Sequence, residues 1–377
     1  MNPIYLDCNA TTPIEPEVKD VLLYFLIEEF GNEGSRTHEY GARAKQAVQK
    51  ARDQVAAVVA AKRDEVIFTS GATESNNIAI LGLRSAGREQ EKRHVITTAI
   101  EHKAVLEPCA ALEQEGFEVT RLPVTAGGFV EPEAVQTALR PDTLLVSVMQ
   151  ANNETGIRQP LDKIAEILGD HPAYFHTDAA QGFGKDIETL RNLRIDLISI
   201  SGHKIYAPKG IGALIVRRRG YERPPLKPLA FGGGQERGLR PGTLPVALIA
   251  ALGEAAEIAV RDHAKRRQIN LRIRGQAMAA LAKLNPRFTG DLSLSLDHVI
   301  NVAFPGLDSE ALMLALKDLV SISNGSACTS SSYTPSHVLK AMGMTDDEAN
   351  ACVRISWCHL TPEVDWDVIV NRISGLR

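Results

Sequence analysis

Short, continuously apolar runs alternate with longer helix-period segments over the first part of the chain. The runs are interpreted as strands at residues 65–69, 94–98, 143–149, 173–177, 196–201 and 212–216. Several are rich in β-branched residues, which is typical of strands buried on both faces. Ala-rich helical segments lie between them, among them 42–61 and 74–83. This alternation predicts an α/β domain with a mostly parallel sheet, whose ligands lie at the carboxyl ends of the strands.

The pattern changes after the last of these runs. Residues 224–242 are rich in Pro and Gly and are interpreted as a long functional loop, which a helical stretch over 244–284 follows. Fewer buried strands come next, at 299–304, 320–323 and 353–357, with helices at 309–319 and 362–373. A chain of 377 residues exceeds a usual single domain. We therefore expect a large domain and a smaller α+β domain, formed by residues 12–255 and by residues 1–11 with 256–377.

Composition excludes some classes of function. The net charge of −4 argues against a general nucleic-acid binder, so we expect no direct nucleic-acid contact. The five cysteines are odd in number and show no zinc-type spacing, which indicates reduced thiols inside a cell and no metal site. The longest early apolar run, 21–27, is too short to cross a bilayer. We expect a cytoplasmic protein without a signal peptide or membrane anchor.

Two ionisable residues directly follow apolar strands. Lys204 lies in the segment SGHKIY. Most lysines are solvated surface residues, but burial at a strand end favours the neutral amine that a Schiff-base nucleophile needs. Asp178 follows the strand at 173–177. It is either the N-cap of a helix or the carboxylate that keeps a proton on the ring nitrogen of pyridoxal phosphate (PLP).

Two further features lie at strand ends of the same expected sheet. In the segment TSGATES at 69–75 a strand ends, a glycine permits a turn and a helix begins. Free N–H groups and the helix dipole favour a phosphate there. His102 follows the strand at 94–98. It is either structural or a residue that stacks on the cofactor ring and moves protons.

The last third of the chain holds a candidate nucleophile and a candidate clamp. Four of the five cysteines lie in apolar or mixed surroundings and are expected to be buried. Cys328 lies in the small polar segment NGSACTSSS, which we predict to be exposed and mobile, and such a thiol is expected to react. Arg354 lies between apolar residues of a strand pattern. It forms either a core salt bridge or a bidentate clamp on a substrate carboxylate.

At this point the chain resembles the cysteine desulfurases of the NifS/IscS type, which are fold-type-I PLP enzymes. The resemblance runs from LDCNATTP near the start to the strand that carries Arg354. It rests on five motifs in this order, FTSGATESNN, EHKAV, NNETG, SGHKIYAPKGIGAL and GSACTS. It implies a large α/β domain with a seven-stranded type of sheet and a smaller α+β domain. It also implies PLP as the cofactor and a homodimer.

The resemblance implies a role for each matching residue. Lys204 is implied to form the Schiff base, Asp178 to pair with the ring nitrogen and His102 to stack on the ring. Gln181 is implied to bind the phenolic oxygen, and Asn153 to contact the cofactor. The phosphate is implied to be held by Ala72, Thr73, Ser201 and His203, and by Thr243 from the other subunit. The substrate is implied to be bound by Asn153 and Arg354, and by the pocket residues Asn32 and Arg36.

The implied reaction converts L-cysteine to L-alanine and leaves a persulfide on Cys328, which passes sulfur to an acceptor protein. LDCNATTP and the segment around Cys328 are most similar to the DndA branch, which is associated with DNA phosphorothioate modification. Iron–sulfur cluster assembly and thiamine or tRNA thiolation are alternatives, and so is a selenocysteine lyase. Two rival interpretations are less favoured. An aminotransferase would need no thiol, and a scaffold protein with a PLP-enzyme fold would need none of Lys204, Asp178, His102 and Cys328.

Two departures from the family pattern stand out. Trp357-Cys358-His359 takes the place of a Leu-Gly-Arg that many relatives carry, so local packing and any second anion contact are expected to differ. The sequence ends at Arg377 without the longer tail of IscS, so we do not expect delivery to the cluster scaffold that this tail docks.

Overall fold

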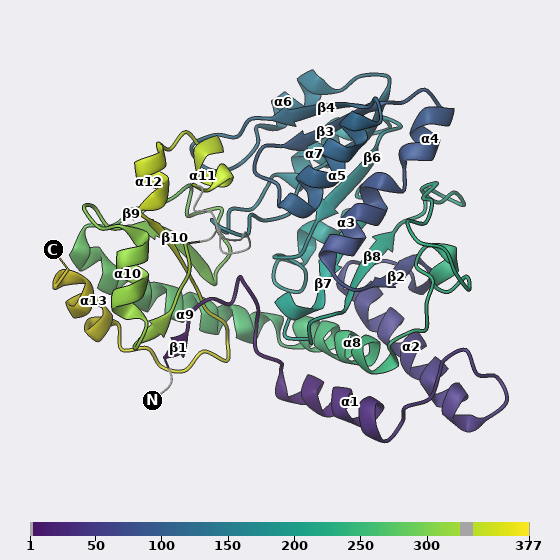
Figure 1. Cartoon of the computed structure of the whole chain (residues 1–377), viewed down its shortest axis with the longest axis horizontal. Coiled ribbons are helices and arrows are strands. Elements are labelled where there is room, and N and C mark those ends of the chain that lie inside the picture. The colour runs from purple at the N-terminus through teal and green to yellow at the C-terminus, as the bar shows by residue number, and fades with distance from the viewer. Residues whose placement is uncertain (1–2, 325–334, 377) are drawn as a thin grey trace.

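A seven-stranded mixed sheet dominates the computed structural model, which describes residues 3–324 and 335–376 (Figure 1). The strand order is β2-β8-β7-β6-β5-β3-β4. Their bounds are β2 (Val66–Thr69), β3 (His94–Thr98), β4 (Glu118–Leu122), β5 (Thr143–Ser147), β6 (Tyr174–Asp178), β7 (Leu197–Ser201) and β8 (Gly212–Val216). The pairs from β4 through β7 are parallel, whereas β8 runs antiparallel to both of its neighbours. The predicted mostly parallel sheet is confirmed.

Helices cover both faces of this sheet. Phe68 packs in a core with helices α1, α2, α7 and α8, while its neighbour Ile67 packs in a second core with α3 and α5. Both faces are buried because adjacent side chains of a strand point to opposite sides. The helices of this part are α1 (Pro16–Ile27), α2 (Glu39–Val58), α3 (Ala72–Leu81), α4 (Arg84–Glu89), α5 (Lys103–Gln114), α6 (Pro132–Ala138), α7 (Leu161–Leu168) and α8 (Val246–Arg261).

The last third of the chain builds a separate core around small sheets. Strand β10 (Val299–Ala303) pairs antiparallel with β9 (Arg287–Phe288) and with β12 (Cys352–Ser356). The N-terminal strand β1 (Ile4–Tyr5) joins this part, because it pairs in parallel with β11 (Val320–Ser321). Leu6, Phe304 and Trp357 are fully buried in its core. Its helices are α9 (His263–Leu281), α10 (Ser309–Leu316), α11 (His337–Ala341), α12 (Asp346–Asn350) and α13 (Trp366–Ser374).

The connections also follow from local sequence. The helical stretch expected over 244–284 is two helices, and Asp262 between α8 and α9 has φ −103° and ψ 10°. These two helices run along the lower side of the molecule and link its two parts (Figure 1). In the part of the chain that the structure describes, no helix is both long and apolar enough to cross a membrane. Single 3-10 turns are η1 (Arg63–Glu65), η2 (Glu188–Arg191), η3 (Gly202–Lys204), η4 (Glu236–Gly238) and η5 (Ala282–Leu284).

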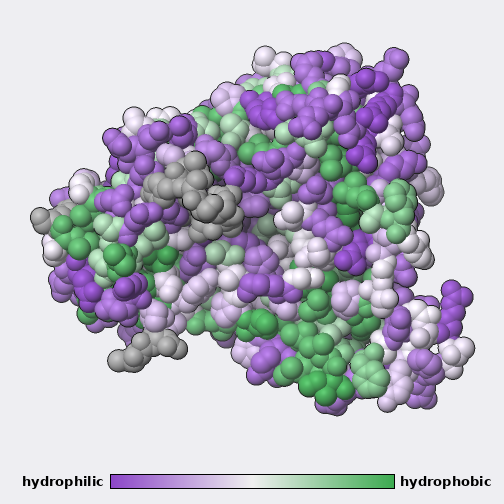
Figure 2. Space-filling view, in the orientation of Figure 1, coloured by the Kyte–Doolittle hydropathy of each residue, from purple (hydrophilic) through white to green (hydrophobic). Residues whose placement is uncertain are grey.

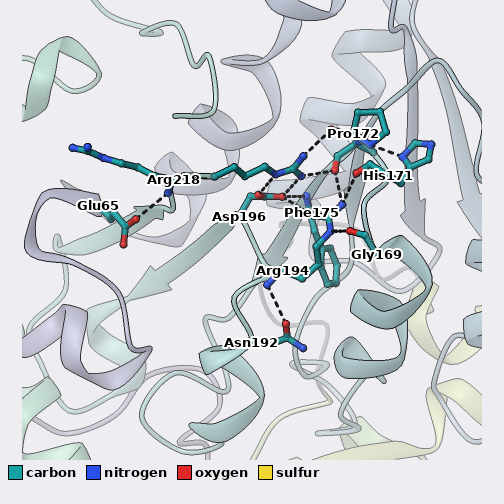
Figure 3. A network of polar contacts seen from close by, with 11 residues as sticks. Glu65, Gly169, His171, Pro172, Phe175, Asn192, Arg194, Asp196 and Arg218 are labelled. Atoms are coloured by element: carbon teal, nitrogen blue, oxygen red, sulfur yellow. Dashed lines mark hydrogen bonds and ion pairs between the residues drawn. The ribbon is translucent and has the colours of Figure 1, made fainter. Parts of the chain in front are cut away.

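A buried carboxylate braces the amino ends of β6 and β7 (Figure 3). Asp196 accepts a hydrogen bond of 2.7 Å from the backbone N–H of Phe175. Its two oxygens also accept from Arg219 at 2.7 Å and one accepts from Arg194 at 3.0 Å. Because charge-assisted bonds are the strong ones, this cluster fixes the relative position of two strands. The opposite ends of the same strands carry the candidate site.

Candidate active site

Four candidate residues or segments lie at one edge of the large sheet. Asp178 is the last residue of β6, and Lys204 lies in η3 directly after β7. His102 and Ala72 begin the helices that follow β3 and β2. These four strands run in the same direction, so their carboxyl ends meet at one edge. In open α/β sheets this edge is where ligands bind.

Asp178 is a buried carboxylate with partners on two elements. It is 5% exposed, and its Oδ2 accepts a hydrogen bond of 2.7 Å from Nδ2 of Asn76 in α3. Its Oδ1 accepts from the backbone N–H of Ala180 at 2.9 Å, which is the local turn expected for Asp after a strand. Sequence reasoning missed Asn76, although it lies inside the motif FTSGATESNN. The contact with Asn76 fixes the carboxylate relative to the start of α3.

Lys204 reaches a segment from the far N-terminus. Its Nζ donates to the backbone oxygen of Asn9 and, at 2.8 Å, to that of Ala10. Nε2 of Gln181 donates to the same Asn9 oxygen at 3.0 Å. The adjacent His203 contacts Thr11 through Nδ1 and Oγ1 at 3.1 Å. The segment 9–12 therefore forms one wall of the site, a role that the sequence analysis did not assign to it.

The start of α3 is open to an anion. Gly71 has φ +155°, a conformation that L side chains rarely adopt, and no side chain caps the helix. The first helical bond runs from Ser75 N to Gly71 O, so the N–H groups of Ala72 and Thr73 precede it. A Cβ placed on Gly71 would lie 3.9 Å from Oγ of Ser201, which brings this turn beside β7.

Two histidines beside the site favour their neutral forms. Burial and the charges of Lys204 and Lys209 lower the pKa of His203 to about 4. His203 is two residues from Ser201, which lies beside the turn at Gly71, and positive charge near this turn favours an anion. Burial also lowers the pKa of His102, against the nearby charge of Asp178. Nδ1 of His102 accepts the N–H of Ala104 at 3.1 Å, so this nitrogen carries no proton in that contact.

Arg354 lies on β12 and is 3% exposed. Its guanidinium donates to the backbone oxygen of Asn153 at 2.9 Å and to Oδ1 of Asp7 at 2.6 Å. Nδ2 of Asn9 donates to the same Asn153 oxygen at 3.1 Å. The salt bridge that the sequence left open as one interpretation is thus present. The network also joins β12 to the segment 9–12, whose backbone oxygens accept hydrogen bonds from Lys204.

Other candidate residues lie elsewhere or outside the described part. Asn32 and Arg36 are exposed in the connection between α1 and α2, which extends away from the large sheet (Figure 1). Within the described part of the chain, the hydrogen bond that Oδ1 of Asn32 accepts is local, from Gly34 N at 2.8 Å. Thr243 is exposed before α8. Cys328 lies outside the described residues, whereas the other four cysteines are buried as predicted.

Comparison with known proteins assigns the chain to a family. The model of the aminotransferase class-V family matches residues 4–368, and the chain belongs to that family. It is 45% identical to the cysteine desulfurase of Homo sapiens over 376 residues, which cover 99% of this chain and 81% of that protein. It is also 45% identical to cysteine desulfurase IscS of Rickettsia africae, over 99% of this chain and 90% of that protein.

Solved structures agree with this assignment. A NifS-like protein superposes with a TM-score of 0.90 at 35% identity and covers 99% of both chains. DndA from Streptomyces lividans superposes with a TM-score of 0.83 at 50% identity, over 94% of this chain and 99% of that one. Within the family the chain is a PLP-dependent cysteine desulfurase. The predicted family, fold class, reaction and cofactor are confirmed.

The residues at the sheet edge fit PLP. Among the described residues, Oε1 of Gln181, Oδ1 of Asn76 and Oδ1 of Asn9 are buried and have no hydrogen-bond partner. Buried polar atoms rarely stay unpaired, so these atoms indicate a polar group that completes the site. The open N-terminus of α3 suits its phosphate, the Asp178 carboxylate suits its protonated ring nitrogen and the Lys204 amine suits its aldehyde.

Proposed function

We propose that the edge formed by β2, β3, β6 and β7 is the active site, with the residue roles that the family resemblance implies. The observation that carries this proposal is the convergence of Asp178, Lys204, His102 and the start of α3 at one sheet edge. PLP supplies an electron sink for the substrate when it is bound. Asp178 keeps the proton on the ring nitrogen, and Ser201 and His203 hold the phosphate with the start of α3.

Lys204 and Arg354 then act on the substrate itself. Lys204 is the amine that holds the cofactor and later takes the proton from the substrate α-carbon. Arg354 and Asn153 hold the α-carboxylate of L-cysteine, because the guanidinium already lies against the Asn153 backbone. Orientation by these two residues places the β-carbon–sulfur bond for cleavage. Asn32 and Arg36 contribute to the pocket when a second subunit completes it.

We place Cys328 as the nucleophile that removes the sulfur. The residues on either side of its segment support this role. Ser323 donates to Oδ1 of Asp7 at 3.1 Å, and that oxygen also binds Arg354. On the other side Ser336 donates to the buried carboxylate of Glu154, the neighbour of Asn153. Both ends of the segment are thus attached beside the proposed substrate clamp.

The test is mass spectrometry of the purified holoenzyme after brief incubation with L-cysteine, with peptide mapping. We expect one added sulfur on the peptide that holds Cys328, together with alanine in solution. Cys328→Ser should keep PLP and form no alanine, while Cys109→Ala, which changes a buried cysteine in α5, should behave as the wild type. Alanine formation by Cys328→Ser would refute the proposal. Alanine in solution without added sulfur on the protein would favour the alternative of a selenocysteine lyase.

A homodimer is the proposed assembly. Leu23, Leu26, Ile27 and Phe30 are 45% to 70% exposed on and after α1. They form an apolar patch at the lower edge of the molecule (Figure 2). Exposed apolar patches of this kind mark protein contacts. Thr243 is exposed and free to reach the cofactor of a partner subunit. Light scattering should give a dimer, and Ile27→Glu should weaken it.

We propose the DndA pathway as the destination of the sulfur, through an acceptor protein in the cytoplasm. The identity of 50% with DndA over 94% of this chain supports this choice. The net charge of −4 agrees with a donor that does not touch DNA itself. The test is complementation of a strain that has lost its DndA. Restored phosphorothioate linkages would support the proposal, whereas rescue of an IscS-deficient strain alone would favour cluster assembly.

The two-domain division stays a proposal. Residues 12–255 would form the large domain, and residues 1–11 with 256–377 the small one. The separate core around Leu6, Phe304 and Trp357 supports this division.

A further inference from the structure

Two buried cysteines from opposite ends of the chain contact each other. Cys8 follows β1, and Cys358 follows β12; each is 1% exposed. They form a small buried cluster with Tyr206. The backbone holds the two segments together, because the N–H of Cys8 donates at 3.1 Å to the oxygen of Ser356, two residues before Cys358. Neither residue has a place in the desulfurase reaction, which uses Cys328.

The sulfur of Cys358 is surrounded by donors. The Cys8 thiol is its neighbour, and Oγ1 of Thr361 donates to it at 3.8 Å. The polar groups around it, the Cys8 thiol foremost, lower the pKa of Cys358 against the effect of burial. The Cys358 sulfur and burial raise the pKa of Cys8. The pair therefore favours one thiolate and one thiol, which is the starting state for disulfide formation.

A buried lysine lies close enough to the pair to interact with its charge. Nζ of Lys185 lies 3.2 Å from Nε2 of His298, a ring whose pKa burial lowers well below its usual value. No carboxylate among the described residues forms an ion pair with Lys185 within 4.0 Å. Burial lowers the pKa of Lys185 to about 8, while negative charge on the cysteine pair opposes this shift. A thiolate at Cys358 is thus an anionic partner for this ammonium group.

A cavity lies next to the pair. It has a volume of about 260 Å³, and its lining includes Lys185, Tyr206 and His298. Tyr206 also belongs to the buried cluster of the two cysteines, so the cavity reaches a side chain of that cluster. A small neutral oxidant can enter a cavity of this size, whereas a protein cannot.

We propose that Cys8 and Cys358 form a second redox site, a dithiol that hydrogen peroxide oxidises to a disulfide. The Cys358 thiolate attacks one peroxide oxygen, the O–O bond breaks and a sulfenic acid and water result. The Cys8 thiol then attacks the sulfenic sulfur, the S–S bond forms and a second water leaves. The two sulfurs supply both electrons, the Cys8 thiol supplies one proton, and the solvent returns the proton that Cys358 had released; a dithiol reductant reverses the reaction.

The disulfide would act on the neighbouring desulfurase site. A disulfide fixes the two Cα atoms at about 4.4 to 6.8 Å and allows the side chains few orientations, so it constrains the two segments relative to each other. Asn9 follows Cys8 directly, and its oxygen accepts hydrogen bonds from Lys204 and Gln181. On the other segment, Ser356 precedes Cys358 by two residues and binds Cys8 N and Asn9 N. Oxidation should therefore weaken the binding of L-cysteine.

The test uses the Cys328→Ser holoenzyme, so that the catalytic thiol does not react. This protein is treated with hydrogen peroxide, alkylated and mapped by mass spectrometry with and without dithiothreitol. We expect Cys8 and Cys358 in one cross-linked peptide that reduction separates, while Cys109 and Cys352 stay alkylatable after denaturation. The absorbance titration with L-cysteine should show weaker binding after oxidation and recovery after reduction.

Matched variants decide the interpretation. Adding Cys358→Ala or Cys8→Ala to Cys328→Ser should abolish both the cross-link and the loss of binding. Adding Cys109→Ala should change neither. A stable sulfinic acid on Cys358 without a cross-link would overturn the proposal, and so would pairing of Cys8 with another cysteine. The result is independent of the Cys328 persulfide, because every protein in the test lacks that thiol.

Discussion

Glu101 provides a sharp test of how burial controls charge beside the active site. Its side chain is fully buried, and its Oε1 accepts hydrogen bonds from Thr98 Oγ1 at 2.8 Å and from Met149 N at 2.9 Å. Its Oε2 is buried and has no hydrogen-bond partner among the described residues. Burial raises the pKa of Glu101 from 4.5 to about 8. The folded protein therefore holds this proton more tightly than the unfolded chain does.

This difference makes stability depend on pH with a definite sign. Because the folded pKa is raised, the stabilisation is complete below pH 4.5 and is lost as the pH rises through about 8. One pKa unit is worth about 1.4 kcal/mol, so the full loss is about 5 kcal/mol. About 3 kcal/mol of it falls between about pH 6 and about pH 9.

Glu101→Gln should remove this dependence, since Gln keeps the Oε1 acceptor and cannot ionise. We expect urea unfolding of the holoenzyme to show that the wild type loses about 3 kcal/mol relative to this variant between about pH 6 and about pH 9. Glu107→Gln on the exposed face of α5 is the control and should run parallel to the wild type. Parallel curves for the wild type and Glu101→Gln would refute the reasoning.

Three further predictions concern the brace and the site. Asp196→Ala leaves two arginines without their shared carboxylate and should cost about 3 to 5 kcal/mol in urea unfolding; an unchanged midpoint would contradict the brace. Asp178→Ala should lower PLP affinity, measured by cofactor absorbance during dialysis, whereas full retention would argue against its role. Arg354→Lys loses the planar fork that reaches Asn153 and Asp7, so KM for L-cysteine should rise more than kcat falls; equal KM values would exclude the clamp.

The strands of the large sheet were predictable because they are continuous apolar runs. Strands β2, β3, β5, β6, β7 and β8 begin and end within two residues of the predicted bounds. Strand β4 was missed, since Glu118–Leu122 mixes polar and apolar residues at the sheet edge, where only one neighbour covers it. The break at Asp262 was invisible because neither Pro nor Gly marks it.

Site residues that directly follow a strand could be predicted from the sequence. Contacts of the site that involve distant segments could not. Lys204, Asp178 and His102 could be placed because each follows an apolar run. Their partners could not, since Lys204 bonds to a backbone oxygen 195 residues away, and a backbone oxygen has no sequence signal. Arg354 and Asp7 are 347 residues apart, and a single sequence does not show which distant residues meet in the fold, so it gave no reason to pair them.

The threading of the N-terminal segment has a consequence for synthesis on the ribosome. Asn9 N bonds to Oγ of Ser356, 347 residues later, and β1 pairs with β11 near the end of the chain. The large sheet contains only residues up to Val216 and can form while translation continues. Residues 4–9 must therefore wait until residues 320–356 have been synthesised before they reach their places. During synthesis, the large sheet can thus be folded while the segment 9–12, which contacts Lys204, is not yet in place.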